Sequence, residues 1–217
     1  MEFKTGITKK GKLKMKKIIA VILSFVLCLS FSACSKEVVS SNDYKQNMES
    51  ITESLNKGKI PEIDFALGDN PDGIKKHFDD QLANESQTEE EGHNHSHDEV
   101  TSFTVTQGLR SVKMDAGKFV YHYEIDKKEK GISVIVSYTK AFGFTAGETT
   151  MQEVSACFDP NSVKKILPSE DDMYFLVYPS SDCMVLRYEK DNLKLDFYFS
   201  ENLLIAAVLL DKANWTL

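Results

Sequence analysis

Cysteine is scarce in this chain, with 4 in 217 residues. Cys28 and Cys34 lie in or directly after an apolar N-terminal run, so only Cys157 and Cys183 belong to the rest of the chain. A chain of this length can bury a sizeable core and does not need a disulfide to fold. An extracytoplasmic location would permit a bond between Cys157 and Cys183, and the sequence leaves open whether they pair.

The chain also lacks a long apolar run. The longest one, Ile18 to Phe31, has about 14 residues, whereas a membrane-spanning helix needs roughly 20. Lysines precede this run, and the small residues Ser32 and Ala33 lead from it into Cys34. This order predicts a lipoprotein signal peptide over residues 1–33, although Phe31 stands where Leu is usual. The alternatives are an ordinary cleaved signal and an uncleaved anchor helix.

Processing of such a signal would make Cys34 the new N-terminus, with a diacylglyceryl group on its thiol. Two acyl chains form a stable membrane anchor where one would be marginal. We therefore expect a lipid-anchored protein at the cell membrane, facing the extracytoplasmic side. Met15-Lys16-Lys17 also resembles a natural start, so Met1 and Met15 are both candidate first residues and residues 1–14 are a candidate upstream extension.

Basic residues are in the minority, with 26 Lys and Arg against 33 Asp and Glu and a net charge of −7. Residues 1–33 hold seven Lys and one Glu, which leaves 19 basic and 32 acidic residues and a net charge of −13 for the rest. Such an acidic chain argues against nucleic-acid binding and against adhesion to anionic lipid headgroups.

Motifs of the common catalytic sites are missing. The sequence contains no Gly-x-Ser-x-Gly, no His-Glu-x-x-His and no phosphate-binding glycine loop. Ser162-Val163-Lys164-Lys165 matches Ser-x-x-Lys, but the companion Ser-Asp-Asn and Lys-Thr-Gly motifs are absent. The carboxylate pairs Asp79-Asp80 and Asp171-Asp172 fit a helix end and a turn. We therefore predict that the protein is not an enzyme.

Two helices are predicted after a tether over residues 34–42. Tyr44, Met48, Ile51 and Leu55 form one apolar stripe, with Ser41 or Asn42 as the cap and Gly58 at the end. Pro71 begins the second helix after the cap residue Asn70, and Ile74, Phe78 and Leu82 share its apolar face. His77 beside them is expected to be a half-buried helix residue.

Alternating apolar residues then predict strands. The first group is 103–106, 109–114, 119–125 and 132–138, a four-stranded antiparallel meander in which His122 is expected on an exposed face. Thr150 and Glu153 form a capping box before a helix with Met151, Val154 and Phe158. The second group is 173–178, 183–188, 193–199 and 203–210, and the last of these is apolar enough for a strand covered on both faces.

These patterns predict an α+β fold. It consists of two degenerate repeats of a helix plus a four-stranded antiparallel meander, preceded by the signal and one N-terminal helix. The first repeat spans residues 43–140 and the second spans residues 141–217.

Three segments carry a resemblance to a known family: Leu55–Pro61, Phe65 with Gly68-Asp69, and Gly147-Glu148-Thr149 with Val154. Through them, residues 44–212 resemble the YjgB-like lipoproteins of Gram-positive bacteria, a family of unknown function. More loosely, they resemble the repeats of β-lactamase-inhibitory-protein-like and SmpA-like lipoproteins. The resemblance implies the fold and the location, and it supplies no catalytic residues.

One stretch contains several residues of the types that bind metal ions. Residues 83–99 contain no large apolar side chain and are expected to be a disordered loop. Within it, His93, His95, His97 and Asp98 could wrap zinc, nickel or copper. The alternative is a solvated acidic loop without a physiological ligand.

Two functions follow as expectations. The first is a membrane-anchored, non-enzymatic binding or envelope-associated module that displays a sheet face to an envelope protein or cell-wall partner. The second is a metal-scavenging or metal-sensing lipoprotein that uses the His-rich loop.

Overall fold

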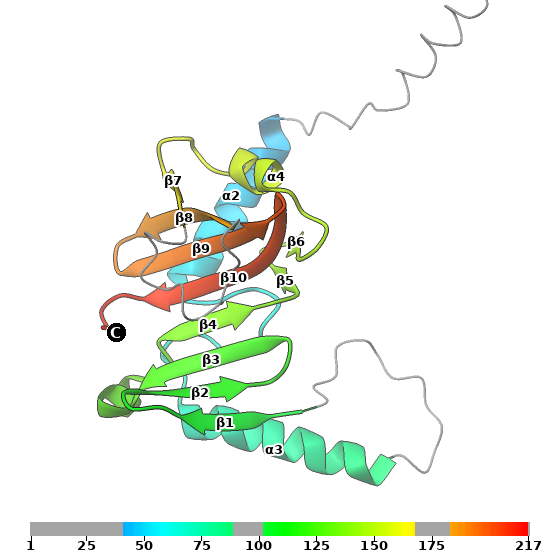
Figure 1. Ribbon diagram of the computed structural model, residues 1–217, viewed down its shortest axis with the longest axis vertical. Helices are drawn as coiled ribbons and strands as arrows, with labels where there is room; N and C mark the ends of the chain where they lie inside the picture. The colour runs from blue at the N-terminus through cyan, green and yellow to red at the C-terminus, as the bar shows by residue number, and fades with distance from the viewer. Residues whose placement is uncertain (1–40, 89–101, 168–182, 217) are drawn as a thin grey trace, which may run out of the picture. The chain divides into compact units, whose positions relative to one another are not determined.

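The computed structural model describes residues 41–88, 102–167 and 183–216, and Ser41–Leu217 forms one compact unit. Its centre is an antiparallel sheet with the strand order β1-β2-β3-β4-β10-β9-β8-β7 (Figure 1). The strands are β1 (Thr104–Gln107), β2 (Ser111–Asp115), β3 (Phe119–Glu124), β4 (Val134–Ser137), β7 (Val163–Ile166), β8 (Met184–Lys190), β9 (Leu193–Ser200) and β10 (Leu203–Asp211). The helices are α2 (Ser41–Asn56), α3 (Pro71–Thr88) and α4 (Met151–Ala156). The predicted α+β class is confirmed.

Two meanders meet in the middle of this sheet. Strands β4 and β10 pair antiparallel, with Val136 opposite Val208 and Val134 opposite Leu210. Both strands are therefore hydrogen-bonded on both sides, and β10 is buried along most of its length. The apolar composition of residues 203–210 thus correctly predicted a central strand.

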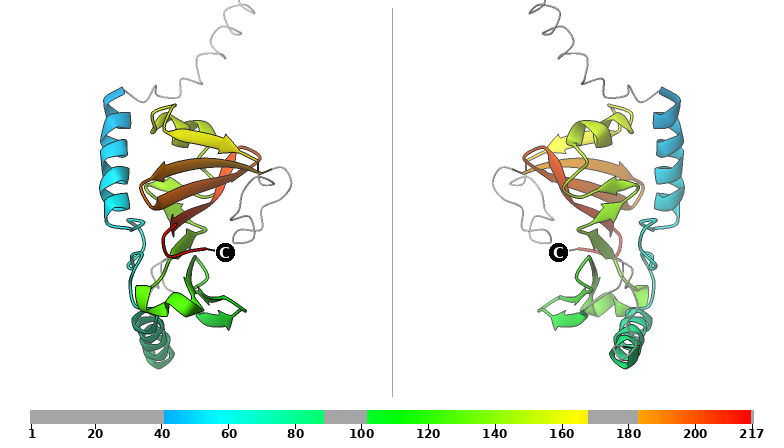
Figure 2. Two further views of the ribbon diagram at one scale, coloured as in Figure 1. Left: turned by 90° about the vertical axis from the view of Figure 1, so that its left-hand side faces the viewer. Right: turned by 90° about the vertical axis from the view of Figure 1, so that its right-hand side faces the viewer.

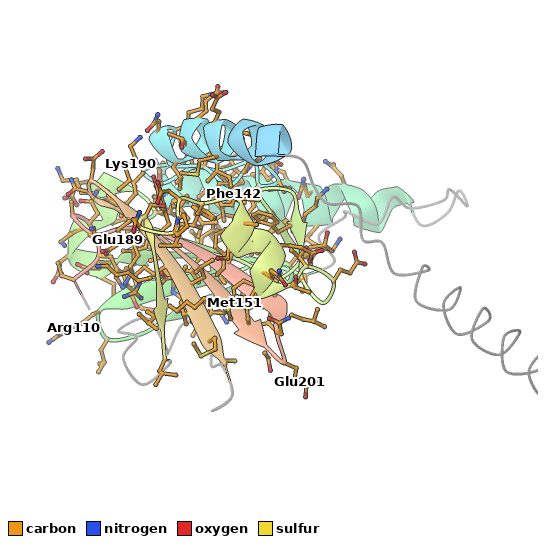
Figure 3. All side chains as sticks on the ribbon, turned by 90° about the horizontal axis from the view of Figure 1, so that it is seen from above. Arg110, Phe142, Met151, Glu189, Lys190 and Glu201 are labelled. Atoms are coloured by element: carbon orange, nitrogen blue, oxygen red, sulfur yellow. The ribbon has the colours of Figure 1, made fainter. Side chains whose placement is uncertain are left out.

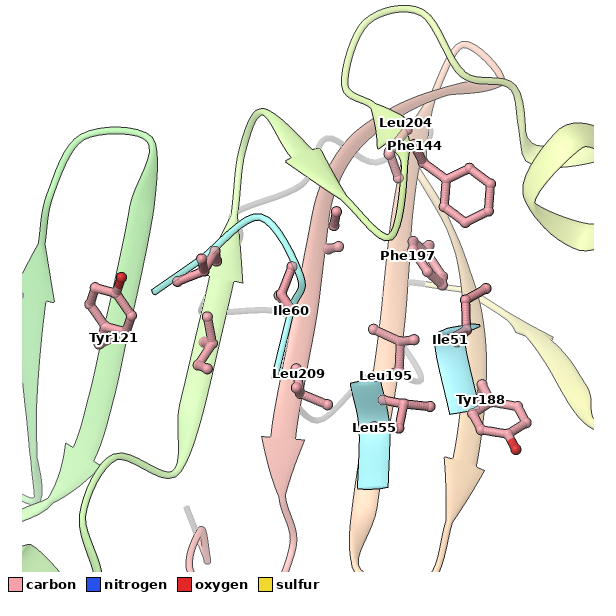
Figure 4. Close-up of a cluster of buried hydrophobic side chains, with 14 of the residues drawn as sticks. Ile51, Leu55, Ile60, Tyr121, Phe144, Tyr188, Leu195, Phe197, Leu204 and Leu209 are labelled. Atoms are coloured by element: carbon pink, nitrogen blue, oxygen red, sulfur yellow. The ribbon is translucent and has the colours of Figure 1, made fainter. Parts of the chain in front are cut away.

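The two faces of the sheet bury different sets of side chains. One face packs against the helices, and α2 stands beside it in the views of Figure 2. Ile51 and Leu55 of α2 share this cluster with Leu195 and Phe197 of β9 (Figure 4). The opposite face carries a second apolar cluster that includes Val136, Val208 and Trp215. We call these the helix face and the opposite face.

Helix α2 follows its predicted stripe. Ile51 and Leu55 are buried and Met48 is half-buried, while the predicted cap residues Ser41 and Asn42 lie within the helix. Gly58 adopts a φ of 61° after the helix, a left-handed conformation that glycine tolerates at a helix end.

Helix α3 begins at Pro71 as predicted, and the Asn70 side chain accepts a hydrogen bond of 2.9 Å from the Asp72 N–H. Its end differs from the prediction, because residues 83–88 continue the helix to Thr88. Extending an existing helix costs far less than nucleating one, so a good helix former such as Ala83 can extend it without large apolar partners. The expectation of a disordered loop is therefore wrong for residues 83–88, and the rest of that loop lies outside the described residues.

The Thr150–Glu153 capping box is confirmed. The Thr150 hydroxyl accepts a hydrogen bond from the Glu153 N–H, and the Glu153 carboxylate accepts one from the Thr150 N–H. The helix that follows, α4, buries Val154 on the helix face.

Several elements were not predicted. A 3-10 helix, Ile125–Lys130, replaces a simple turn, and β5 (Lys140–Ala141) pairs with β6 (Phe144–Thr145) in a small hairpin. Strand β7 pairs with β8, while the strand predicted over 173–178 lies outside the described residues.

Cys157 and Cys183 are both buried thiols and form no disulfide. In the described ranges, no helix is both long and apolar enough to cross a membrane.

Candidate binding surface at the edge of the sheet

The sheet ends at two different edges, β1 and β7. All four residues of β1 are exposed, and Val105 is exposed to 46%. The stretch from Ser102 to Leu109 contains no charged residue. Strand β7 instead exposes Lys164 and Lys165, and lysines on an edge strand discourage the pairing of another strand. The β1 edge, meaning the outer side of Thr104–Gln107, is thus neutral and carries no lysine on its own strand.

Hydrogen bonds at the β1–β2 turn show which backbone groups point outward. The Gly108 N–H donates to the Ser111 carbonyl at 2.8 Å. Hydrogen-bonded pairs alternate along an antiparallel ladder, so Thr106 bonds Lys113 and Thr104 bonds Asp115. The N–H and C=O groups of the residues between them therefore point away from β2.

Those outward-facing residues are Val105 and Gln107. Each presents one backbone donor and one acceptor at the β1 edge. The β2–β3 ladder agrees with this phase, since the Ala116 N–H donates to the Phe119 carbonyl at 2.9 Å and the Ile125 N–H donates to the Arg110 carbonyl at 2.8 Å. Arg110 itself, in the β1–β2 turn, projects from the periphery of the molecule (Figure 3).

Helix α3 flanks this edge. Phe78 of α3 stacks on Phe103, just before β1, with ring centroids 4.8 Å apart. Val105 lies on the same side of the sheet, because it pairs with Met114, which belongs to the helix-face core. In Figure 1 the C-terminal part of α3 extends past β1, and Figure 2 shows α3 at the same end of the sheet.

A side-chain amide of α3 has an unused acceptor. The Gln81 Oε1 atom is buried and, among the described residues, accepts no hydrogen bond. A buried acceptor without a donor is costly.

Charged side chains also lie on the opposite face, where β8 and β9 pair. Arg187 forms two hydrogen bonds to Asp196, Nε to Oδ1 at 2.8 Å and Nη2 to Oδ2 at 2.7 Å. Asp196 is fully buried and Lys194 is 3% exposed. A bidentate Arg–carboxylate pair of this kind stabilises buried charge in place, and we interpret it as structural.

His122 contradicts its prediction. It was expected on an exposed face, but it is 7% exposed because the C-terminal segment crosses β4 and places the Trp215 ring against it, with centroids 5.8 Å apart. Burial, followed by the nearby Lys113 charge, lowers the pKa of His122 to about 4. His122 is therefore neutral at pH 7.

Glu124 holds the end of this segment. Its carboxylate accepts hydrogen bonds from the Thr216 N–H and from the Thr216 hydroxyl, the latter at 2.9 Å, and pairs with Lys127 at 3.1 Å. Burial alone would raise the pKa of Glu124, but these donors hold that pKa below its usual value. The contacts of Trp215 and Thr216 thus fix the segment that follows β10 against β3.

The other described side chains that the sequence suggested for catalysis or ligand binding do not come together in one site. The Ser162 hydroxyl donates to the Asp159 carbonyl at 2.8 Å, and Lys165 is exposed on β7. His77 is half-buried as predicted, and its ring lies edge to face with the Phe65 ring, with the two ring centroids 5.1 Å apart. Asp79 pairs with Lys75 on the exposed side of α3.

The residues proposed for lipidation and metal binding, Cys34, His93, His95, His97 and Asp98, lie outside the described residues, as does the Asp171-Asp172 pair. In the part of the chain that the structure describes, no group of three or more His, Cys, Asp or Glu side chains could hold a metal ion.

Sequence reasoning missed the β1 edge, although one feature could have indicated it. An uncharged run with alternating threonines, residues 101–109, directly follows the acidic His-rich segment. Such a run predicts a strand, but only the sheet order reveals that this strand has a single neighbour. No protein-family model, curated protein or solved structure matches the chain.

Proposed function

We propose that this chain is a lipoprotein, anchored through a diacylglyceryl group on Cys34 at the extracytoplasmic side of the membrane. Its folded part acts as a non-enzymatic module that binds an envelope protein or a cell-wall partner. The observation that carries the binding role is the β1 edge, which is exposed and uncharged in a chain where 27% of residues are charged. Val105 and the fully exposed Leu109 add apolar surface there.

The grooves of the described surface support binding better than catalysis. One groove of the described surface, of about 600 Å³, is lined by residues such as Met151, Phe158 and Lys165, and Lys165 is its one charged lining residue. A second, of about 450 Å³, holds Asp72 and Lys128, which already pair with each other at 2.7 Å. Ser155 and Lys165 both line the first groove, but among the described residues no hydrogen bond joins their side chains.

The repeat architecture is part of the same proposal. Helix α3 precedes β1–β4, and α4 precedes β7–β10. The sheet order runs first to fourth strand in one half and fourth to first in the other. That order fits two degenerate copies related by a two-fold axis between β4 and β10.

The lipid anchor is tested by metabolic labelling with an alkyne-bearing palmitate. We expect the chain to be labelled and to fractionate with membranes, and the Cys34→Ser variant to lose the label. Cys28→Ser and Cys157→Ser are the matched controls and should keep it. A label that persists in Cys34→Ser would contradict the anchor.

The binding role is tested by placing a photo-cross-linking amino acid at Leu109 in living cells. We expect a discrete adduct from this position and none from Leu203, an exposed leucine at the start of β10. Equal adducts from both positions, or no adduct from either, would contradict a binding site at the β1 edge.

Metal binding is the second candidate function, and the His-x-His-x-His-Asp pattern of residues 93–98 favours it. Imidazole nitrogens suit zinc, nickel and copper. Such a loop would capture or buffer metal beside the membrane.

A further inference from the structure

We propose that the β1 edge receives an extended peptide segment of a partner protein as an antiparallel ninth strand of the sheet. The segment is neutral at its centre, carries β-branched residues, and has basic residues at its flanks. This inference rests on the proposed binding function and names its partner class and its mode.

Backbone complementarity is the first argument. The N–H and C=O groups of Val105 and Gln107 point away from β2, whereas those of Thr104 and Thr106 are used in the β1–β2 ladder. An added antiparallel strand satisfies the outward-facing groups without disturbing the existing ladder. Strand addition of this type obtains its affinity from the main chain and its specificity from alternate side chains.

Side chains define which residues the segment needs. Residues directly opposite each other in a ladder point to the same face, so the peptide residue that bonds Val105 points toward α3. There it meets Val105, the Phe103 ring and the α3 surface that extends past β1. A β-branched apolar residue fits this position, and a charged one would be desolvated without a partner.

Charge defines the flanks. The β1 edge is uncharged, but residues 34–217 carry a net charge of −13. A long-range field of this sign attracts basic groups. The peptide therefore combines a neutral centre of four to six residues, the approximate length of a short strand, with lysine or arginine on either side.

A second copy of this chain fits the edge less well. Antiparallel pairing of β1 with its copy, about an axis perpendicular to the sheet, would bring both α3 helices to the same side of the joined sheet. Because α3 already extends past β1, the two helices would have to occupy the same space beside the joined β1 strands. Packed helices need about 8–10 Å between their axes. A single strand needs only about 4.8 Å.

The experiment uses the full-length chain in detergent micelles and the synthetic peptide Lys-Thr-Val-Thr-Val-Thr-Lys. Two isomers of it are N-methylated, one at both Val residues and one at the second and third Thr residues. We expect saturable binding of the unmodified peptide. N-methylation at Val should abolish binding, because those N–H groups point at β1, while N-methylation at Thr should be tolerated.

The matched protein variants are Val105→Pro and Val105→Thr. Proline removes the outward-facing N–H of Val105 and no hydrogen bond of the β1–β2 ladder, a change that an edge strand tolerates, so Val105→Pro should keep the fold and lose the peptide. Val105→Thr keeps the N–H and should keep the binding. At a free peptide concentration ten times its Kd, the Val105 and Gln107 amides should exchange hydrogen about tenfold more slowly, while the Thr104 and Thr106 amides should change little.

Three results would overturn the proposal. They are equal binding by Val105→Pro and the unmodified chain, equal binding by both N-methylated isomers, and absence of binding by the unmodified chain. Concentration-dependent dimers that Val105→Pro abolishes would instead assign the edge to a second copy. A Leu109 photo-adduct that persists after any of these results would retain the proposed binding function and reject only the ninth-strand mode.

Discussion

His122 shows how one distant contact changes the chemistry of a side chain. Its place in an alternating strand assigns it to the face opposite Tyr121, and this assignment is correct. The solvent exposure of His122 on that face is set by Trp215, which lies 93 positions further along the chain. The Trp215 and His122 rings contact each other edge to face. The nearest charges, Lys113 and Asp115 on β2, pair with each other at 2.8 Å and act on the pKa of His122 in opposite directions.

The depressed pKa of His122 predicts a pH-dependent stability. The pKa is about 4 in the folded chain against 6.5 for the ordinary side chain, so between these values the unfolded chain binds a proton that the folded chain does not. Stability is therefore full above pH 6.5 and falls as the pH drops toward 4. We expect about 2–3 kcal/mol less stability from this residue at pH 4.5 than at pH 7.

The measurement is urea unfolding followed by the fluorescence of Trp215, the single tryptophan of the chain. His122→Phe keeps an aromatic ring and removes the titration, so its stability should fall less between pH 7 and pH 4.5. Equal losses in the two proteins would show that His122 does not titrate across this range.

At the level of elements, the backbone at Gly131 passes very close to the backbone at Gly68. This contact holds the 3-10 helix Ile125–Lys130 against the loop before α3. A Cβ atom at Gly131 would lie 2.1 Å from the Gly68 carbonyl oxygen. The Ile132 N–H also donates to the Asp69 carbonyl at 3.0 Å, and the Gly68 N–H donates to the Ile132 carbonyl at 2.8 Å. Glycine at 131 is what permits this close approach of two backbones.

Gly131→Ala is expected to destabilise the chain by about 3 kcal/mol or more, because backbone strain and a steric clash add. Gly147→Ala is the matched control. Gly147 has a φ of 80°, close to the 81° of Gly131, but no atom lies within 4 Å of its added Cβ. It should cost only about 1–2 kcal/mol. Thermal and urea unfolding of both variants measures the difference, and equal losses would refute the steric argument.

For the whole molecule, the continuous sheet leaves two ends with different surfaces, and the His-rich segment of the chain precedes the β1 end in sequence. The proposed metal binding by that segment can be tested separately from the proposed binding at the β1 edge. The two remaining histidines, His77 and His122, are held in aromatic contacts with Phe65 and Trp215. Neither contributes to a three-ligand group in the described part of the chain.

Zinc and nickel titration calorimetry on the full-length chain tests the metal hypothesis. We expect saturable binding that is lost when His93, His95 and His97 are all changed to Ala, because imidazoles at alternate positions of an extended segment can share one ion. His77→Ala is the control and should bind as the unmodified chain does. Equal heats in the triple variant and the unmodified chain would make this segment a solvated spacer.

The sequence by itself determined the local structure of this protein. Periodicity and capping chemistry placed α2, the start of α3, α4 and most of the strands, because helix stripes, strand alternation and caps depend on residues within a few positions of one another. It also carries the predictions for Cys34 and for the His-rich segment, which are patterns of adjacent residues. Composition argued against nucleic-acid binding but did not locate the proposed binding surface.

Only the tertiary structure decided how the strands are ordered and which faces are covered. The pairing of β4 with β10 joins residues about 70 positions apart, and no local pattern encodes such a contact. That pairing places β10 at the centre and leaves β1 and β7 as edges. The neutral β1 edge, the flanking α3 and the burial of His122 under Trp215 all follow from contacts between distant segments, whose energies depend on packing in three dimensions.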